Sequence, residues 1–579
     1  MRVADEERDD HPRLLLGPLL RYVDEHRATV WVETDRPCAV AVLAGEVRAV
    51  APTWSVHGHH YALVRVEELP ARTATPYRVE LDGHPVWPLP GSPFPPSVIR
   101  TADPDAPLRL SFGSCRRSAP FDAAHLEQLG ADALVALAAR MAGAPHDTWP
   151  DLLLLLGDQV YADEPSEEIR ERLRAVHHGR DPEIAEEIQD FEEYTWLYHE
   201  AWTPPAVRWL LSTVPSGMLL DDHDLRDDWN TSLSWRREVT AKPWWRDRVT
   251  GAYASYWVYQ HLGNLSPEQL DADETYQRML TLGTDAERTR HLDEMAWRAD
   301  CDPTTMRWSF CRDLGGAGRR VRLVAIDGRC SRQLDPDDRR MVDAVEWAWV
   351  REQVLDPDHP DEHLVLASTL PLLLLPGIHH LEGWDEAISE GAWGRPGKWI
   401  GERLRQLLDL EHWAAWRASF AEVVTLLEEI VQRPDPPSTI LLLGGDVHAS
   451  YTATAELARV AHPGTAIHQL TMSPFRNVIE RPAKAAFRLL NRKAPAAVAH
   501  RLARWSGVED VAVHWVVEHG VWFDNGVMSL DLAGRAASLT VDRAVHDGHD
   551  QRLEEVLTVE LAPRTPSPDA DVDGATATV

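Results

Sequence analysis

The feature that most constrains this chain is a series of short, largely apolar segments of strand length. They occupy residues 108–112, 152–156, 218–220, 321–326, 364–367 and 440–443. Apolar strands of this kind are typical of sheets covered on both faces, as in layered α/β folds. Helices are expected in between, at 123–142, 337–354 and 400–431. The sequence therefore predicts an α/β fold (α+β layered) for most of the chain.

Polar motifs follow five of these segments directly. They are GSCR at 113–116, GDQVY at 157–161, DDHD at 221–224, DGR at 327–329 and GGDVH at 444–448. In α/β sheets, ligands bind in the crevice beyond the carboxyl ends of the strands. We therefore expect these distant stretches to assemble one polar site.

The residue types in these motifs indicate metal binding. Carboxylates suit hard cations such as Ca²⁺, Mg²⁺ or Mn²⁺, whereas thiolate and phenolate favour a transition metal such as Fe³⁺. A site with both kinds of donor is best explained by two or more metals that share a bridging carboxylate. Asp446 and His448 are two residues apart, so in extended backbone their side chains face the same side.

The motifs together resemble those of the calcineurin-like metallophosphoesterases, and within them the alkaline phosphatase D (PhoD-like) family. That family is similar in carrying GSC where the superfamily has DxH, and DDH[DE] where the superfamily has GNH[DE]. The GDxxY form at 157–161 also occurs in purple acid phosphatases, and the DxR and GDVH elements follow in the expected order. The resemblance covers residues 108 to about 475.

The resemblance implies a metallophosphatase αββα sandwich and a set of metal ligands. The resemblance implies that Cys115, Asp158 and Tyr161 ligate Fe³⁺ and that Asp158 bridges to one or more Ca²⁺ ions. Other divalent metals could take the place of Ca²⁺. The remaining ligands that it implies are Asp222, Asp446, His448 and, where family members often carry asparagine, Asp228.

The resemblance also implies the chemistry. A metal-bound hydroxide at a multinuclear site attacks the phosphorus of a small phosphate ester, either a monoester or a diester. His223 serves as general acid for the leaving alkoxide or supports the metal ligands. Arg116 and Arg329 grip phosphate oxygens, which the guanidinium fork matches bidentately.

One element of the superfamily pattern has no clear counterpart here. The isolated histidine is missing from residues 364–371, and His379 and His380 follow nearby as substitutes. This departure keeps open an alternative, a non-catalytic binding protein with a metallophosphatase fold. A second alternative is a hydrolase with Ser114 or Cys115 as nucleophile, but no GxSxG elbow is present.

Composition shifts divide the chain into three parts. Residues 14–96 are expected to form a small β-sandwich module that ends in a proline-rich linker at 85–96, and residues 17–34 resemble the opening of a fibronectin type III-like module. The phosphatase domain is expected to span 97–563. The tail at 564–579, rich in Pro, Ala, Thr and Asp, is expected to be disordered.

Composition also limits partners and location. The 59 Lys and Arg against 92 Asp and Glu give a net charge of −33, which argues against a nucleic-acid-binding surface. Five cysteines without a CxxC pair argue against a disulfide scaffold or a zinc ribbon. No run of about 18 apolar residues predicts a membrane span, and residues 1–13 resemble no export signal. We therefore expect a cytoplasmic protein, or one whose true start lies upstream, and nothing indicates a protein partner.

Overall fold

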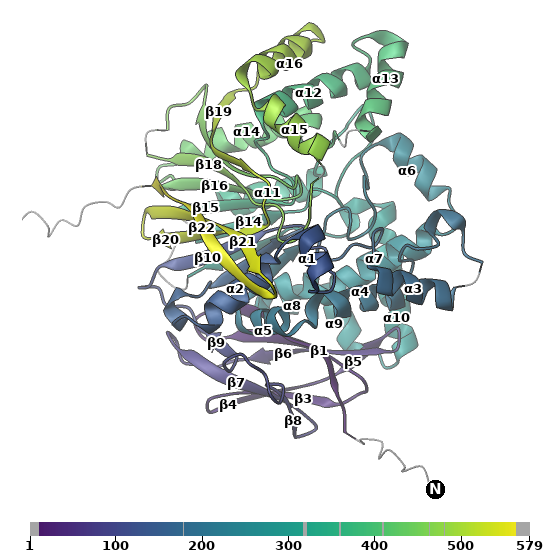
Figure 1. Ribbon diagram of the computed structural model, residues 1–579, viewed down its shortest axis with the longest axis vertical. Helices are drawn as coiled ribbons and strands as arrows, with labels where there is room; N and C mark the ends of the chain where they lie inside the picture. Colours follow the sequence, from purple (N-terminus) through teal and green to yellow (C-terminus); the bar gives the residue numbers. More distant parts are fainter. Residues whose placement is uncertain are drawn as a thin grey trace, which may run out of the picture.

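The computed structural model describes residues 11–177, 179–315, 321–357, 361–407, 410–462, 464–479 and 481–562. Two large facing sheets flanked by helices form the body, and a smaller β-sandwich lies beneath them (Figure 1). The predicted α/β layered fold with an N-terminal β-sandwich is thus confirmed. The tail expected to be disordered, 564–579, lies outside the described residues.

The N-terminal β-sandwich consists of two antiparallel sheets around one core. The first sheet has the order β1 (Leu14–Val23), β2 (Ala28–Thr34), β6 (His59–Val66) and β5 (Trp54–Val56). The second has the order β4 (Val47–Pro52), β3 (Ala39–Ala44), β7 (Ala74–Leu81) and β8 (His84–Trp87), with β9 (Val98–Arg100) also paired to β7. Valines of both sheets meet in the core, among them Val30, Val42 and Val79. The segment expected as a linker therefore begins as an edge strand, since β8 includes Pro85.

The main body contains a six-stranded and a seven-stranded sheet. The first has the order β12 (Ser216–Leu219), β11 (Leu152–Leu156), β10 (Leu108–Gly113), β20 (Gly526–Ala533), β21 (Ala536–Asp547) and β22 (Asp550–Ala562). The second has the order β13 (Phe310–Leu314), β14 (Val321–Ile326), β15 (His363–Ser368), β16 (Thr439–Gly444), β18 (Ala466–Thr471), β17 (Ser450–Leu457) and β19 (Val513–Trp522). The strands β10 to β12, and likewise β14, β15, β16 and β18, run parallel, so their carboxyl ends share an edge.

Packing on both faces explains the all-leucine sequence of β11. Leu152, Leu154 and Leu156 enter the core between the two large sheets. Leu153 and Leu155 point to the opposite face, where they join the core formed with the helices and the N-terminal sandwich. Each face of the strand is therefore buried, as the continuous apolar run predicts.

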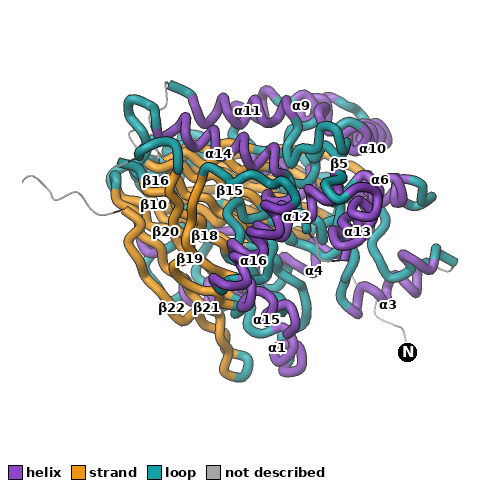
Figure 2. Tube along the Cα trace, turned by 90° about the horizontal axis from the view of Figure 1, so that it is seen from above, coloured by secondary structure: helices purple, strands orange, loops and turns teal. Residues whose placement is uncertain are grey.

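Helices cover the outer faces of both sheets. The helices on the side of the six-stranded sheet are α2 (Ala133–Ala142), α4 (Phe191–Trp202), α5 (Pro205–Thr213), α7 (Trp245–Tyr259) and α10 (Asp285–Cys301). The same part of the chain also contains α1 (Ala123–Leu129), α3 (Glu167–Val176), α6 (Leu233–Thr240), α8 (Pro267–Ala272) and α9 (Glu274–Thr281). On the seven-stranded sheet, α11 (Ala344–Leu355) and α14 (Arg417–Val431) pack along one side of the strands, as Figure 2 shows.

A group of four helices lies at the top of the molecule in Figure 1. It comprises α12 (Pro376–Glu390), α13 (Gly394–Leu407), α15 (Arg481–Leu490) and α16 (Lys493–Trp505). Among the helices of the described ranges, none combines the length and apolar character needed to cross a bilayer.

Two of the expected helices are interrupted. The segment 123–142 divides into α1 and α2, because Gly130 has a φ of 75° and Asp132 caps α2 by accepting hydrogen bonds from the amides of Leu134 and Val135. The segment 400–431 divides into α13 and α14, and the expected start at 337 is replaced by a start at Ala344, capped by Asp343. Apolar periodicity continues across such caps, so it could not locate them.

Leu154→Ala should destabilise the body strongly. Leu154 is fully buried between the sheets, and its δ-methyl group lies close to Gly217 of β12. Removal of a leucine side chain at such a site costs about 2–5 kcal/mol, because a cavity remains. Urea unfolding should show this loss, whereas Leu280→Ala, at a site that is 48% exposed, should change stability little. Equal effects of the two substitutions would contradict the assignment of the inter-sheet core.

Candidate metal centre

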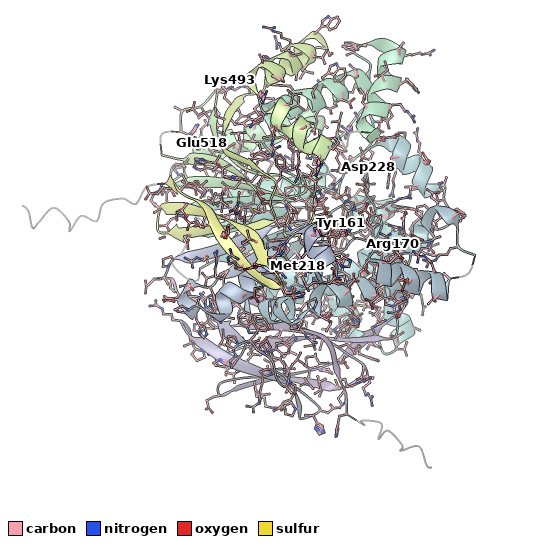
Figure 3. All side chains as sticks on the ribbon, viewed as in Figure 1. Tyr161, Arg170, Met218, Asp228, Lys493 and Glu518 are labelled. Carbon is pink, nitrogen blue, oxygen red and sulfur yellow. The ribbon has the colours of Figure 1, made fainter. Side chains whose placement is uncertain are left out.

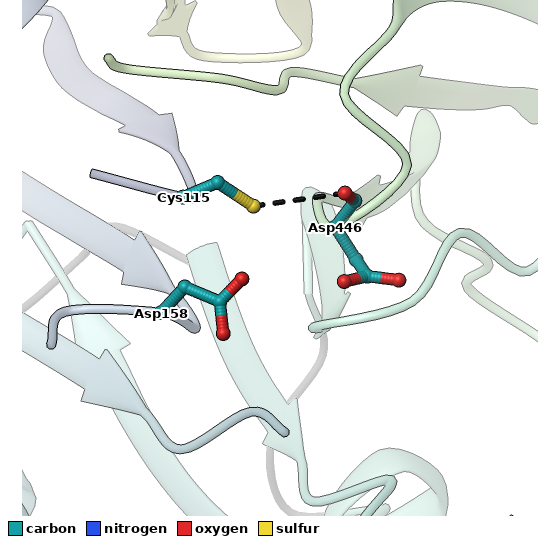
Figure 4. Close-up of side chains that lie close together, drawn as sticks. All are labelled: Cys115, Asp158 and Asp446. Carbon is teal, nitrogen blue, oxygen red and sulfur yellow. Dashed lines mark hydrogen bonds between the residues drawn. The ribbon is translucent and has the colours of Figure 1, made fainter. Parts of the chain in front are cut away.

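Cysteine, aspartate and histidine side chains from both sheets converge where the parallel strands end. Three overlapping groups have potential ligand atoms that all lie within 4.8 Å of one another. The groups are Cys115 with Asp158 and Asp446; Asp158 with Asp222 and His223; and Asp158 with Asp221, Asp222 and Asp446. Figure 4 shows the first group, whose side chains point toward one another from separate loops. Asp158 belongs to all three groups and is the centre of the cluster.

Tight turns place these side chains. Cys115, Asp158 and Asp446 have positive φ values of 56°, 52° and 61°, which non-glycine residues rarely adopt. A Cβ atom on Gly157 would lie 2.5 Å from the Cβ of Asp221, and one on Gly445 would lie 2.5 Å from Ser114. The two glycines therefore let the strand-end loops approach closely. Strained backbone of this kind is typical of functional sites.

Asp158 is a buried carboxyl group that faces several other carboxylates, with His223 as the nearby cation. Its side chain is fully buried, and neither carboxylate oxygen has a hydrogen-bond partner among the described residues. Burial, together with the charges of Asp221, Asp222 and Asp446, raises the pKa of Asp158 well above its usual range. Since an unpaired buried carboxylate is costly, the geometry fits a cation at this position.

Cys115 lies beside Asp158 and is fully buried, with the hydroxyl group of Ser114 at 3.1 Å from its Sγ. Its Sγ accepts a hydrogen bond from Ser473 Oγ at 3.3 Å and lies 3.6 Å from the backbone oxygen of Asp446 (Figure 4). Burial and the neighbouring carboxylates raise the pKa of the thiol well above its usual value. A metal ion would reverse this effect, because coordination favours the thiolate.

Tyr161 and His448 share a contact with Asn477, which follows β18. The amide of Asn477 donates to Tyr161 Oη at 2.9 Å, and its Nδ2 lies 3.4 Å from His448 Nε2. Burial, reinforced by the charge of His223, lowers the pKa of His448 to about 3. The ring is therefore neutral at pH 7, the state in which histidine binds metals.

His223 is held by a buried carboxylate. Its Nδ1 lies 3.0 Å from Asp163, and its ring centroid lies 4.6 Å from that of Tyr161. Burial opposes the charge, but Asp163, Asp158 and Asp222 outweigh it and raise the pKa of His223 well above its usual value. The imidazolium therefore forms part of the charge balance of the cluster.

Arg329 is fully buried among carboxylates. Its Nε donates to Asp221, its Nη1 donates to Glu411 at 2.5 Å, and its Nη2 lies 3.4 Å from Asp222 and 3.8 Å from Asp446. Glu411 also accepts from Arg332 Nη1 at 2.9 Å. The partners of this guanidinium among the described residues are protein carboxylates.

Asp224 organises the same loops through backbone amides. It accepts hydrogen bonds from the amides of Asp158 at 3.0 Å, Val160 at 3.2 Å and Asp221 at 2.9 Å. The fourth residue of the DDHD motif thus fixes the loops after β11 and β12 in one arrangement.

Five predicted site residues lie outside the three groups, namely Arg116, Tyr161, Asp228, Arg329 and His448. The Arg116 guanidinium donates to Asp132 at 2.9 Å and to the backbone oxygen of Ala201 at 2.8 Å, so the structure gives no contact that supports phosphate binding. Asp228 lies outside the three groups, and its amide donates to Asp222 Oδ2 at 3.3 Å. Tyr161 and His448 are linked to the cluster through Asn477 and through Asp446, two residues before His448.

The expected substitutes for the missing histidine lie elsewhere. His379 packs against Phe420 and Trp515, and His380 packs against His500. Instead, His412 has Nε2 at 3.8 Å from Asp446 Oδ2, and its Nδ1 lies 2.6 Å from Glu382. Burial lowers the pKa of His412, but Glu382 and Asp446 outweigh it and raise the value to about 9. Sequence reasoning missed His412 because it follows no strand; its only signal is a Glu-His pair before the apolar segment at 413–416.

His379→Phe should reduce the loss of folding stability that occurs as the pH falls below 6.5. Burial lowers the pKa of His379 to about 3, so below pH 6.5 the unfolded chain binds a proton that the folded chain does not. Stability is therefore lost as pH falls from 6.5, by up to about 1.4 kcal/mol per pH unit. Thermal melts between pH 6.5 and 4.5 should show a smaller decline for His379→Phe than for wild type. The exposed control His546→Phe should match wild type, and a parallel decline for all three proteins would contradict this account.

Comparison with known proteins agrees with the geometry. The profile of the family described as PhoD-like phosphatase matches residues 136–479, more than half of the chain. The chain belongs to the PhoD-like phosphatase family. Its members are metalloenzymes, so the acidic cluster is a site that could bind metal and the chain is assigned to a family of phosphatases. A domain of unknown function, DUF7800, matches residues 11–99.

Solved structures support the fold. The structure titled "Structure of PhoD" aligns at 12% identity with a TM-score of 0.55 and covers 96% of this chain and 93% of that one. A maltogenic amylase from S. marinus aligns at 10% identity over 97% of this chain and 84% of that one, with a TM-score of only 0.15. No curated protein matches the chain.

Proposed function

We propose that this PhoD-like phosphatase hydrolyses phosphate esters, monoesters or diesters, with the help of a multinuclear metal cluster. The environment of Asp158 is the main support for the proposal. Its side chain is fully buried, has no hydrogen-bond partner among the described residues and belongs to all three ligand groups. A carboxylate in this setting is suited to bridging two cations. Bound metals would supply activation of a water molecule and neutralisation of phosphate charge.

The donor types support an assignment of the metals. Cys115, Tyr161 and Asp158 offer thiolate, phenolate and carboxylate, which suit Fe³⁺. Asp222 and Asp446, with Asp221 close by, offer carboxylate oxygens, which suit Ca²⁺ or another hard divalent cation. His448 is neutral and lies at the Tyr161 side of the cluster, and Asp228 remains a proposed ligand at its margin.

His223 is proposed as the proton donor for the leaving alkoxide. A ring nitrogen lies within 4.8 Å of carboxylate oxygens of Asp158 and Asp222, so the imidazolium is at the cluster itself. Asp163 fixes the ring through Nδ1. The Arg329 guanidinium, in contrast, contacts carboxylates, which supports a role in positioning Asp221, Asp222 and Asp446.

In place of the isolated histidine, His412 is proposed to position the ligand Asp446, whose Oδ2 lies 3.8 Å from His412 Nε2. His412→Asn should reduce cation affinity by about 10–100-fold, a loss usual for groups that support metal ligands. Metal content after dialysis against graded chelator measures this, with His380→Asn as the matched control. Unchanged metal retention in His412→Asn would overturn the role.

The overall proposal is tested by elemental analysis together with hydrolysis of p-nitrophenyl phosphate and bis-p-nitrophenyl phosphate. We expect bound iron and a divalent metal, turnover of at least one substrate, and loss of both metal and turnover with chelator. A filled metal site without turnover would favour a non-catalytic binding protein. Turnover that resists chelator but not thiol- or serine-directed reagents would favour a nucleophile at Cys115 or Ser114; among the described residues, no histidine hydrogen-bonds to either side chain.

A further inference from the structure

The four-helix group above the metal centre has a charge opposite to that of the rest of the chain. Residues 481–508, which contain α15 and α16, hold seven lysine or arginine residues and no aspartate or glutamate, in a chain of net charge −33. Three of the chain's four lysines, Lys398, Lys484 and Lys493, lie in α13, α15 and α16. We call α13, α15 and α16 the basic cap; Lys493 is labelled in Figure 3.

The basic cap also exposes large apolar side chains. Trp505 at the end of α16 is 78% exposed and Trp399 of α13 is 69% exposed. Val498 and Leu489 are 63% and 52% exposed, and α15 has no buried residue. The rings of Trp393 and Trp505 lie 5.4 Å apart, so the start of α13 and the end of α16 form one surface.

The basic cap is connected to the metal centre. Phe487 of α15 packs against a small apolar cluster that contains Val447, the residue between Asp446 and His448. Asn477, which contacts Tyr161 and His448, lies four residues before the start of α15. Any surface bound by the cap would therefore lie next to the rim of the site.

We propose that the basic cap docks the protein on an anionic lipid bilayer surface. Amphipathic helices with basic residues and exposed tryptophan bind the bilayer interface through apolar insertion and attraction to anionic headgroups. Tryptophan favours the headgroup region, which distinguishes this surface from one built for a soluble polyanion. The acidic remainder of the chain is repelled by the same membrane, so docking is oriented with the cap toward the lipid. This inference goes beyond the proposed function, because binding requires no turnover.

Vesicle flotation with the full chain tests the proposal. We expect at least about tenfold more protein on phosphatidylcholine vesicles that contain phosphatidylglycerol than on phosphatidylcholine alone, with the difference lost at high salt. Trp399→Ala/Trp505→Ala and, separately, Lys493→Glu/Arg501→Glu should each lower binding by at least about tenfold. The matched control Arg48→Glu changes an exposed arginine of the N-terminal sandwich and should bind like wild type.

Three results would overturn the proposal. These are equal binding to both vesicle types, cap variants that float like Arg48→Glu, and binding to heparin by wild-type protein that does not float with anionic vesicles. The last would identify a soluble polyanion as the partner. Because the substituted side chains are exposed, thermal melts should show that all variants are folded. Either of the two cap variants alone is sufficient to test the docking proposal. Elemental analysis of the same samples separates failure of docking from failure of the metal proposal.

Discussion

Asp158→Asn should abolish metal binding and lower kcat/KM by about 10³-fold or more, since bound metals supply several kcal/mol of transition-state stabilisation. The substitution keeps the size of the side chain but removes the charge shared by all three ligand groups. If Asp158 bridges the two metals as proposed, elemental analysis should show iron and the divalent metal lost together. Loss of one metal with full retention of the other would contradict the bridging role.

The same variant should have the opposite effect on the stability of metal-free protein. Without cations, wild-type Asp158 is a buried carboxylate with no hydrogen-bond partner among the described residues, which is unfavourable. Asp158→Asn removes this charge, so in chelator the variant should melt at a higher temperature than wild type, and without chelator at a lower one. Asp542→Asn is a matched control, because Asp542 is also buried but is bound bidentately by Arg140. It should retain metal and melt lower under both conditions.

The centre of the site follows from sequence because of its topology. Cys115, Asp158 and Asp446 each come just after a strand of a parallel set, and parallel strands end at one edge. Apolar runs locate those strands, so the convergence of these residues is predictable from the sequence. That two separate sheets contribute to one site could be predicted only from the family resemblance, because apolar runs do not reveal the order of strands in a sheet.

The surrounding groups could not be predicted from the sequence. His412, Glu411 and Asn477 lie on irregular segments that the packing of α12 to α14, and the turn after β18, bring to the cluster. Arg116 shows the converse limit, since it adjoins Cys115 in sequence but its guanidinium binds Asp132. Sequence adjacency therefore identifies the loop but not the direction of a long side chain.

Arg329→Met should destabilise the metal-free protein by about 3–5 kcal/mol, the usual cost of removing one partner of a buried ion pair. Arg329 contacts Asp221, Asp222, Glu411 and Asp446, and their charges raise its pKa despite complete burial. Urea unfolding in chelator measures the loss. Arg329→Met/Glu411→Gln should recover part of it, because one of the unpaired carboxylates is then neutral. No recovery in the double variant would contradict an electrostatic origin.

Kinetics and metal content of the Arg329 variants separate the two roles that this arginine can have. If Arg329 grips substrate phosphate, Arg329→Lys should raise KM while metal content stays at the wild-type level, because lysine lacks the bidentate fork. If it positions the carboxylates, metal affinity should fall and kcat should fall with it, while KM at saturating metal changes little. The buried contacts with four carboxylates favour the second outcome. Wild-type metal affinity in Arg329→Lys together with a raised KM would return the residue to the phosphate-binding role that the motif implies.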